Sequence, residues 1–303
     1  MSSYRFCRTD DIGLLVDALN RCWGPYFPGE APVTAAAFKR SIRDLQVWCS
    51  SCMVAFDGAD PIGVLIGAKR SSGTLVHKIA VHPDHRRQGH ARHMLTSLGS
   101  KLAILGPRRI VAEVPEALVP CCGLFDASGY VQETVLTDYV WERDQARVSD
   151  VEAGAERAPQ RSASPVGRFV IPVTVDDLAA NELLGNDSPP TCWERAVQTL
   201  TARKDEITGL GVASDERIEA YLLYMEGEVL SLRSFVEDGG DRLKLLLSGL
   251  CGRTFHFRKV HPSEVPNDVL ETLGFHAARS YRHYAADSQP AQGAAGTDVR
   301  ASS

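Results

Sequence analysis

The stretch VHKIAVHPDHRRQGHARHML, residues 76–95, changes from a strand pattern to a helix pattern near its centre. Pro83 ends the strand, because proline cannot donate a hydrogen bond to a central β-ladder. Beyond it, apolar residues recur at helical spacing: Ala91, Met94, Leu95, Leu98, Leu102 and Leu105. The sequence therefore predicts a strand, an Arg/Gly-rich turn and a long helix that begins near Gln88.

The N-terminus of this helix has the features of an anion site. Its first backbone N–H groups have no partner within the helix, and the helix dipole places partial positive charge there. Gly89 has no Cβ to keep a ligand away, and Arg86, Arg87 and Arg92 add positive charge. These features favour a pyrophosphate over a carboxylate. The turn has neither the GK[ST] of a P-loop nor the GxGxxG of a dinucleotide fold.

The hexad RRQGHA, residues 86–91, resembles the R/Q-x-x-G-x-G/A signature of the GNAT superfamily of acetyl-CoA-dependent N-acetyltransferases. The strand before it, IAVHPD at 79–84, and the element LFDASGY at 124–130 resemble the matching parts of that family. The resemblance covers about residues 4–142. It implies that acetyl-CoA is a co-substrate, with its pyrophosphate on the turn and its pantetheine arm paired with the preceding strand. The coenzyme-binding residues implied are Ile79, Ala80, Val81, Arg86, Arg87, Gln88, Gly89, His90, Ala91 and Arg92.

The resemblance also implies residues for the chemistry. Glu113 matches a family carboxylate that removes the amine proton, although a structural salt bridge at this strand end is nearly as good an interpretation. The Val81 N–H matches the family's oxyanion donor. Two positions depart from the family: Phe125 replaces a tyrosine acid, and Leu118 replaces an asparagine that contacts the coenzyme.

The acceptor pocket is placed by analogy with the same family. The aromatic loop CWGPYFPGE, residues 22–30, and the segment near Tyr139 are expected to line it. Trp23, Tyr26 and Phe27 are candidates for stacking on an apolar or cationic acceptor. The alternative is that these rings only pack an ordinary loop.

Composition limits the class of protein. The chain has 303 residues, 44% of them apolar, and a formal net charge of -5, which argues against a nucleic-acid binder. No apolar run reaches membrane-spanning length, so a cytoplasmic protein without membrane attachment is expected. Eight irregularly spaced cysteines favour reduced thiols. Five histidines fall within residues 77–93, but no carboxylate or cysteine completes a ligand set nearby, so no metal site is predicted.

The predicted fold class is α/β (α+β), as tandem GNAT folds that each have a mixed, mostly antiparallel sheet flanked by helices. Four segments are expected: a GNAT domain at 1–143, a linker at 144–167, a degenerate GNAT-like domain at 168–286 and a disordered tail at 287–303.

The segment at 168–286 repeats the strand, helix and Gly-aromatic pattern of the segment at 1–143. Its loop EDGGD, residues 237–241, is shorter and acidic, and would repel a pyrophosphate. Arg258 stands at the place of Glu113, and Leu270 at the place of Phe125. The second copy is therefore expected to bind no coenzyme.

The sequence thus predicts an N-acetyltransferase that moves acetyl from acetyl-CoA to a primary amine of a small molecule or peptide by direct attack in a ternary complex. The alternative is a non-catalytic acetyl-CoA sensor or a protein-interaction module. The identity of the acceptor is not encoded in these motifs, and a homodimer is left open.

Overall fold

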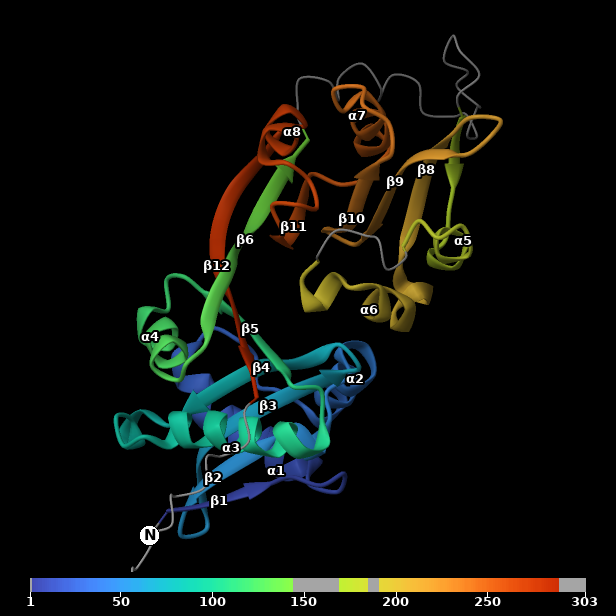
Figure 1. Ribbon diagram of the computed structural model, residues 1–303. Coiled ribbons are helices and arrows are strands. Elements are labelled where there is room, and N and C mark those ends of the chain that lie inside the picture. The colour runs from blue at the N-terminus through green and yellow to red at the C-terminus, as the bar shows by residue number, and fades with distance from the viewer. Residues whose placement is uncertain (1, 144–168, 185–190, 289–303) are drawn as a thin grey trace, which may run out of the picture. The chain divides into compact units, whose positions relative to one another are not determined.

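The computed structural model describes residues 2–143, 169–184 and 191–288 (Figure 1). The predicted linker and all but Asp287 and Ser288 of the predicted tail lie outside the described residues. Two compact units are present. Unit 1 comprises Met1–Val114, Leu118–Glu133 and His283–Ser303, and unit 2 comprises Pro115–Ala117 and Thr134–Arg282.

Unit 1 is a mixed sheet with helices. Its elements are β1 (Ser2–Phe6), α1 (Ile12–Cys22), α2 (Ala35–Leu45), β2 (Met53–Asp57), β3 (Asp60–Arg70), β4 (Gly73–Val81), α3 (His90–Leu105), β5 (Arg109–Pro115) and α4 (Val119–Ala127). The strand order is β1-β2-β3-β4-β5, followed by parts of β12 and β6. The first four strands pair antiparallel, and β5 runs parallel to β4.

Unit 2 repeats this plan. Its elements are β7 (Phe169–Pro172), α5 (Val175–Ala180), α6 (Val197–Ala202), β8 (Thr208–Ala213), β9 (Ile218–Met225), β10 (Glu228–Ser234), α7 (Asp241–Ser248), β11 (Thr254–Val260) and α8 (Asn267–Thr272). Helices and strands follow in the same order as in unit 1, and β11 again runs parallel to β10. The predicted α/β class, with a mostly antiparallel sheet in each fold, is confirmed.

Two long strands each belong to both units. These are β6 (Val131–Glu142) and β12 (Phe275–Asp287), green and red in Figure 1. Tyr139 of β6 lies in the core of unit 2, and Tyr284 of β12 lies in the core of unit 1. These units cross the bounds of the expected domains 1–143 and 168–286, which stay a prediction: residues 134–143 belong to unit 2, and residues 283–286 belong to unit 1.

The core of unit 1 fixes the long helix after the turn. Met94, Leu95, Leu98 and Leu102 of α3 are buried against side chains of β2 to β5, as the spacing predicts. Leu105 is 67% exposed, so its predicted place on the apolar face is wrong: it is the last residue of the helix. No helix in the described parts of the chain is long and apolar enough to cross a membrane.

Candidate functional site

In unit 1 the parallel strands β4 and β5 separate partway along their length. They pair only where Thr74 meets Ile110 and Leu75 meets Val111. Beyond these pairs β4 continues to Val81, with its other edge still paired to β3. The edge of β4 that faces the gap can therefore offer backbone donors and acceptors to an extended ligand.

The turn after β4 leads directly to the N-terminus of α3. Arg87 and Gly89 both have positive φ, at 62° and 87°, and Gly89 is the N-cap of the helix. A Cβ added at Gly89 would meet nothing within 4 Å, so the space beside this backbone is open. The first N–H groups of a 16-residue helix thus face an exposed turn, which suits an anionic group.

The arginines of the turn lie at its rim. The Arg86 guanidinium stands 4.1 Å from the centre of the Tyr26 ring, and Arg92 Nη2 donates to Ala127 O at 2.6 Å. Arg87 and Gln88 are exposed. The residues present therefore fit a pyrophosphate: open backbone N–H groups are surrounded by three positive side chains.

His90 points into the protein rather than to the solvent. It is 5% exposed, and its Nδ1 lies 2.6 Å from Tyr4 Oη. Burial lowers the pKa of His90, which keeps the imidazole neutral. We therefore expect His90 to serve a ligand through its backbone. Across the described ranges no group of three His, Cys, Asp or Glu residues could hold a metal ion.

A charged cluster lies on the sheet face opposite α3. Ile110, Ala112 and Val114 of β5 belong to the core, so Arg109 and Glu113 project from the other face. Arg109 Nη2 donates to Glu133 Oε2 at 2.5 Å, and this bond lowers the pKa of Glu133.

His283 of β12 joins this cluster. Its Nδ1 lies 3.5 Å from Glu133 Oε2, and the imidazole also interacts electrostatically with Glu113. Burial lowers the pKa of His283, and the two carboxylates partly oppose this shift. His283 could not be predicted from sequence motifs, because only the position of β12 next to β5 in the sheet brings it near Glu113.

The aromatic loop lies beside β4. Trp23 stacks on Phe27 with ring centres 4.7 Å apart, and the Lys78 ammonium stands 4.3 Å from the centre of the Trp23 ring. Tyr26 Oη donates to Val81 O at 2.8 Å. Three of the predicted acceptor residues are thus brought together at the end of β4. Tyr139 is not among them: it is buried in unit 2 and donates to Asn267 Oδ1.

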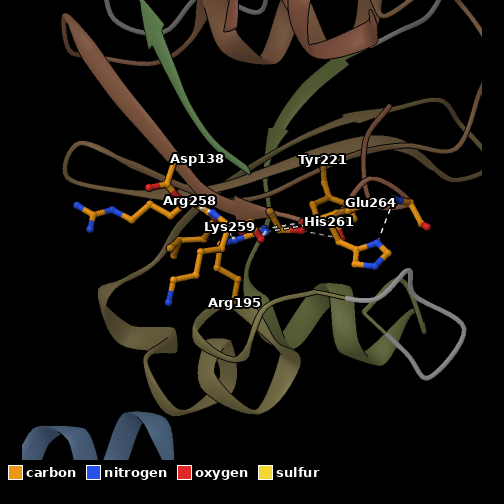
Figure 2. A network of polar contacts seen from close by, with 10 residues as sticks. Asp138, Arg195, Tyr221, Arg258, Lys259, His261 and Glu264 are labelled. Carbon is orange, nitrogen blue, oxygen red and sulfur yellow. Dashed lines mark hydrogen bonds and ion pairs between the residues drawn. The ribbon is translucent and has the colours of Figure 1, made fainter. Parts of the chain in front are cut away.

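The equivalent gap in unit 2 is filled by a side chain. Strands β10 and β11 pair only where Glu228 meets His256 and Val229 meets Phe257. Arg195 enters beyond these pairs, donating to Leu230 O at 3.1 Å and to Arg258 O at 2.7 Å (Figure 2). The guanidinium thus bridges the two strands where they separate.

The helix N-terminus in unit 2 is also occupied by the chain itself. Asp238 Oδ1 accepts from Gly240 N and Oδ2 from Arg242 N, and Oδ2 also pairs with the Arg242 guanidinium at 2.6 Å. Both features that are open in unit 1 are therefore filled in unit 2.

Residues 48–132 match a family model described as "Acetyltransferase (GNAT) domain". Among solved structures, a tandem GNAT protein from the clavulanic acid biosynthesis pathway is similar, at 16% identity over 96% of this chain and 99% of its own, with a TM-score of 0.58. A GCN5-related N-acetyltransferase from Sphaerobacter thermophilus is similar at 13% identity over 95% and 96% of the two chains, with a TM-score of 0.60. One from Anabaena variabilis is similar at 11% identity over 95% and 73%, with a TM-score of 0.61. No curated protein sequence matches the chain. At these identities the structural likeness establishes the fold.

Proposed function

We propose that the protein transfers the acetyl group of acetyl-CoA to a primary amine of a small molecule or peptide, since residues 48–132 match the model of a GNAT acetyltransferase domain. The observation that carries the proposal is the gap between β4 and β5, which leads to an open turn at the N-terminus of α3. Bound acetyl-CoA supplies the activated acetyl group. The chain's own residues bind and orient both substrates and remove the proton of the amine.

The coenzyme site is assigned to the end of β4 and the turn. The backbone of Ile79, Ala80 and Val81 would pair with an extended pantetheine arm, and the Val81 N–H would stabilise the oxyanion. The backbone of residues 87–92 would hold the pyrophosphate, with Arg86, Arg87 and Arg92 neutralising its charge. The open space at Gly89 supports this assignment.

The acceptor is assigned to the opposite side of the gap. Glu113 stands on β5 beyond its last pair with β4, and a carboxylate there can draw a protonated amine and help remove its proton. Trp23, Tyr26 and Phe27 would border the acceptor. Two of these rings already make cation–π contacts within the chain, Trp23 with Lys78 and Tyr26 with Arg86. These contacts support the assignment of the loop as a surface that can stack on a positively charged acceptor.

Unit 2 is assigned no coenzyme. Arg195 fills its strand gap, and Asp238 caps its helix N-terminus. We propose that unit 2 supports unit 1, because β12 begins in unit 2 and continues into unit 1, where its Tyr284 lies in the core. The proposal includes a cytoplasmic location and leaves a homodimer open.

One observation favours a second candidate, a non-catalytic acetyl-CoA sensor. Phe125, which replaces the family's tyrosine acid, is 1% exposed and packs between Tyr130 and Tyr284. It has no proton to give to a thiolate. In an enzyme, the thiolate would take its proton from water.

The test combines turnover with binding. Release of free thiol from acetyl-CoA is followed against polyamines, aminoglycosides, amino acids and peptides, and coenzyme binding is titrated calorimetrically. We expect one acetyl-CoA per chain and turnover with at least one class of amine. Binding without turnover would favour the sensor, no binding would remove both candidates, and two sites would contradict the assignment for unit 2.

A further inference from the structure

We propose that His283, from the last strand of the chain, is the group that takes the proton of the acceptor amine, while Glu113 and Glu133 hold and stabilise its imidazole. The inference rests on the proposed acetyl transfer by unit 1. It changes the role of Glu113, which becomes a positioning residue beside the base rather than the base itself.

The first argument is placement. Tyr284 of β12 lies in the core beneath α3, so its neighbour His283 projects from the opposite face of the sheet. Glu113 projects from that same face of β5, next to β12 in the strand order. Glu113 lies beyond the last pair between β4 and β5, at the gap that is assigned to the acetyl group, and His283 lies on β12, the next strand after β5.

The second argument concerns the hydrogen bonding of His283 Nδ1. Its side chain is 20% exposed, and Nδ1 is buried with no hydrogen-bond partner in the described part of the chain. A carboxylate oxygen of Glu133 nevertheless lies 3.5 Å from this nitrogen. A buried imidazole nitrogen beside a carboxylate becomes stable when the ring gains a proton, since the ion pair then forms.

The third argument is charge. Burial lowers the pKa of His283 from its ordinary value of 6.5, so the ring is neutral at neutral pH. With the proton of the neutral ring on the buried Nδ1, beside Glu133, the lone pair that takes the amine proton is on Nε2. The charged groups that act on it are Glu113 and Arg109 of β5 and Glu133 of β6. The two carboxylates favour the imidazolium, and Arg109 opposes them while it is bound to Glu133.

The proposed step balances as follows. The acceptor ammonium gives one proton to Nε2 of His283, and the lone pair of the amine nitrogen then attacks the thioester carbonyl carbon. The C–N bond forms and the C–S bond breaks, with the electron pair leaving on the thiolate. The second N–H proton leaves as the amide forms and balances the proton that the thiolate takes up from water. The imidazolium then returns its proton to solvent.

The experiment compares three variants of the full chain: His283→Gln, Glu113→Gln and His276→Gln. His276 is an exposed histidine on the same strand and serves as the matched control. For each variant, kcat and KM are measured from pH 5 to pH 9 with an amine that the wild type accepts, and acetyl-CoA affinity is measured separately.

For His283→Gln we expect kcat to fall about 100-fold or more, with coenzyme affinity unchanged. The decrease in kcat/KM at acidic pH, centred below 6.5 in the wild type, should disappear. In Glu113→Gln this decrease should persist but move to lower pH, because a carboxylate that favours the imidazolium has been removed. The His276→Gln variant should behave as the wild type.

The reverse pattern would overturn the proposal: an acidic decrease that survives in His283→Gln and is lost in Glu113→Gln would make Glu113 the base. Loss of coenzyme affinity together with kcat in His283→Gln would make the histidine structural. A wild type that binds acetyl-CoA but turns over no amine would overturn both this inference and the proposed acetyl transfer. Wild-type turnover with normal activity in His283→Gln would overturn this inference alone.

Discussion

Arg195 and Glu264 form a two-bond ion pair inside unit 2, with Nη1–Oε1 and Nη2–Oε2 distances of 2.6 and 2.7 Å. Their side chains are only 3% and 6% exposed. The guanidinium also donates to backbone carbonyls of β10 and β11, and it lies over the Phe257 ring with 4.5 Å to the ring centre. In unit 2 this ion pair therefore fills the gap between β10 and β11, whereas the corresponding gap between β4 and β5 in unit 1 is open.

Replacing one partner of this pair should be costly. Arg195→Ala leaves the Glu264 carboxylate buried without its partner. We expect the free energy of unfolding, measured in urea, to fall by about 3–5 kcal/mol. The double variant Arg195→Met/Glu264→Met leaves no unpaired charge, so it should be more stable than Arg195→Ala. Both variants lose the bonds of Arg195 to backbone carbonyls, so a double variant less stable than the single one would show that the unpaired Glu264 carboxylate is not the main cost.

The proposed pyrophosphate site is tested at Gly89. Gly89→Glu adds a negative charge and a side chain beside the α3 amides, and acetyl-CoA should no longer raise the melting temperature. Gly58 is a matched control, since it too has positive φ (59°) and open space around an added Cβ, but lies in the β2–β3 turn. Both variants carry similar backbone strain. Loss of coenzyme binding in Gly58→Glu as well would attribute the effect to backbone strain rather than to the proposed pyrophosphate site.

Tyr284 should be needed for the fold of unit 1 although it lies near the other end of the chain. Its ring stacks on Phe125, with centres 5.6 Å apart, and it is fully buried. Tyr284→Ala should cost about 3–5 kcal/mol, as removal of a buried aromatic ring does. Hydrogen exchange should rise in β4 and α3. The counterpart Tyr139→Ala should instead raise hydrogen exchange in β11 and α7. If Tyr284→Ala raised hydrogen exchange only in unit 2, the assignment of Tyr284 to the core of unit 1 would be wrong.

Two buried cysteines should be inert at ordinary pH. Burial raises the pKa of the Cys7 thiol from 9.0 to about 12 and that of Cys22 to about 11. Each buried neutral thiol therefore contributes to the free energy of unfolding. This contribution is complete below pH 9.0 and is lost as the pH rises from there toward the pKa of the folded state. At pH 8 iodoacetamide should modify the exposed Cys251 and leave Cys7 and Cys22 intact, as read by mass spectrometry. Rapid alkylation of Cys7 in the folded protein would contradict its burial.

The sequence by itself determined the local plan of unit 1. Pro83 and Gly89 fix the turn through their own backbone preferences, and the apolar spacing from Met94 to Leu102 fixes the buried face of α3. The resemblance to GNAT proteins rests on that turn and is confirmed by the family match at 48–132. Such features are readable because they depend on interactions between residues close in the chain. Even so, the helix begins at His90 rather than Gln88, since Gly89 takes a left-handed conformation.

Only the tertiary structure decided which distant segments meet. Tyr139 lies within the expected segment 1–143 but is in the core of unit 2, and Tyr284 lies within the expected segment 168–286 but is in the core of unit 1. The same pairing brings His283 to the cluster of Glu113 and Glu133. The pairing of strands depends on how their side chains are buried against segments far apart in the chain. Because this burial involves distant residues, it leaves no local pattern in the sequence.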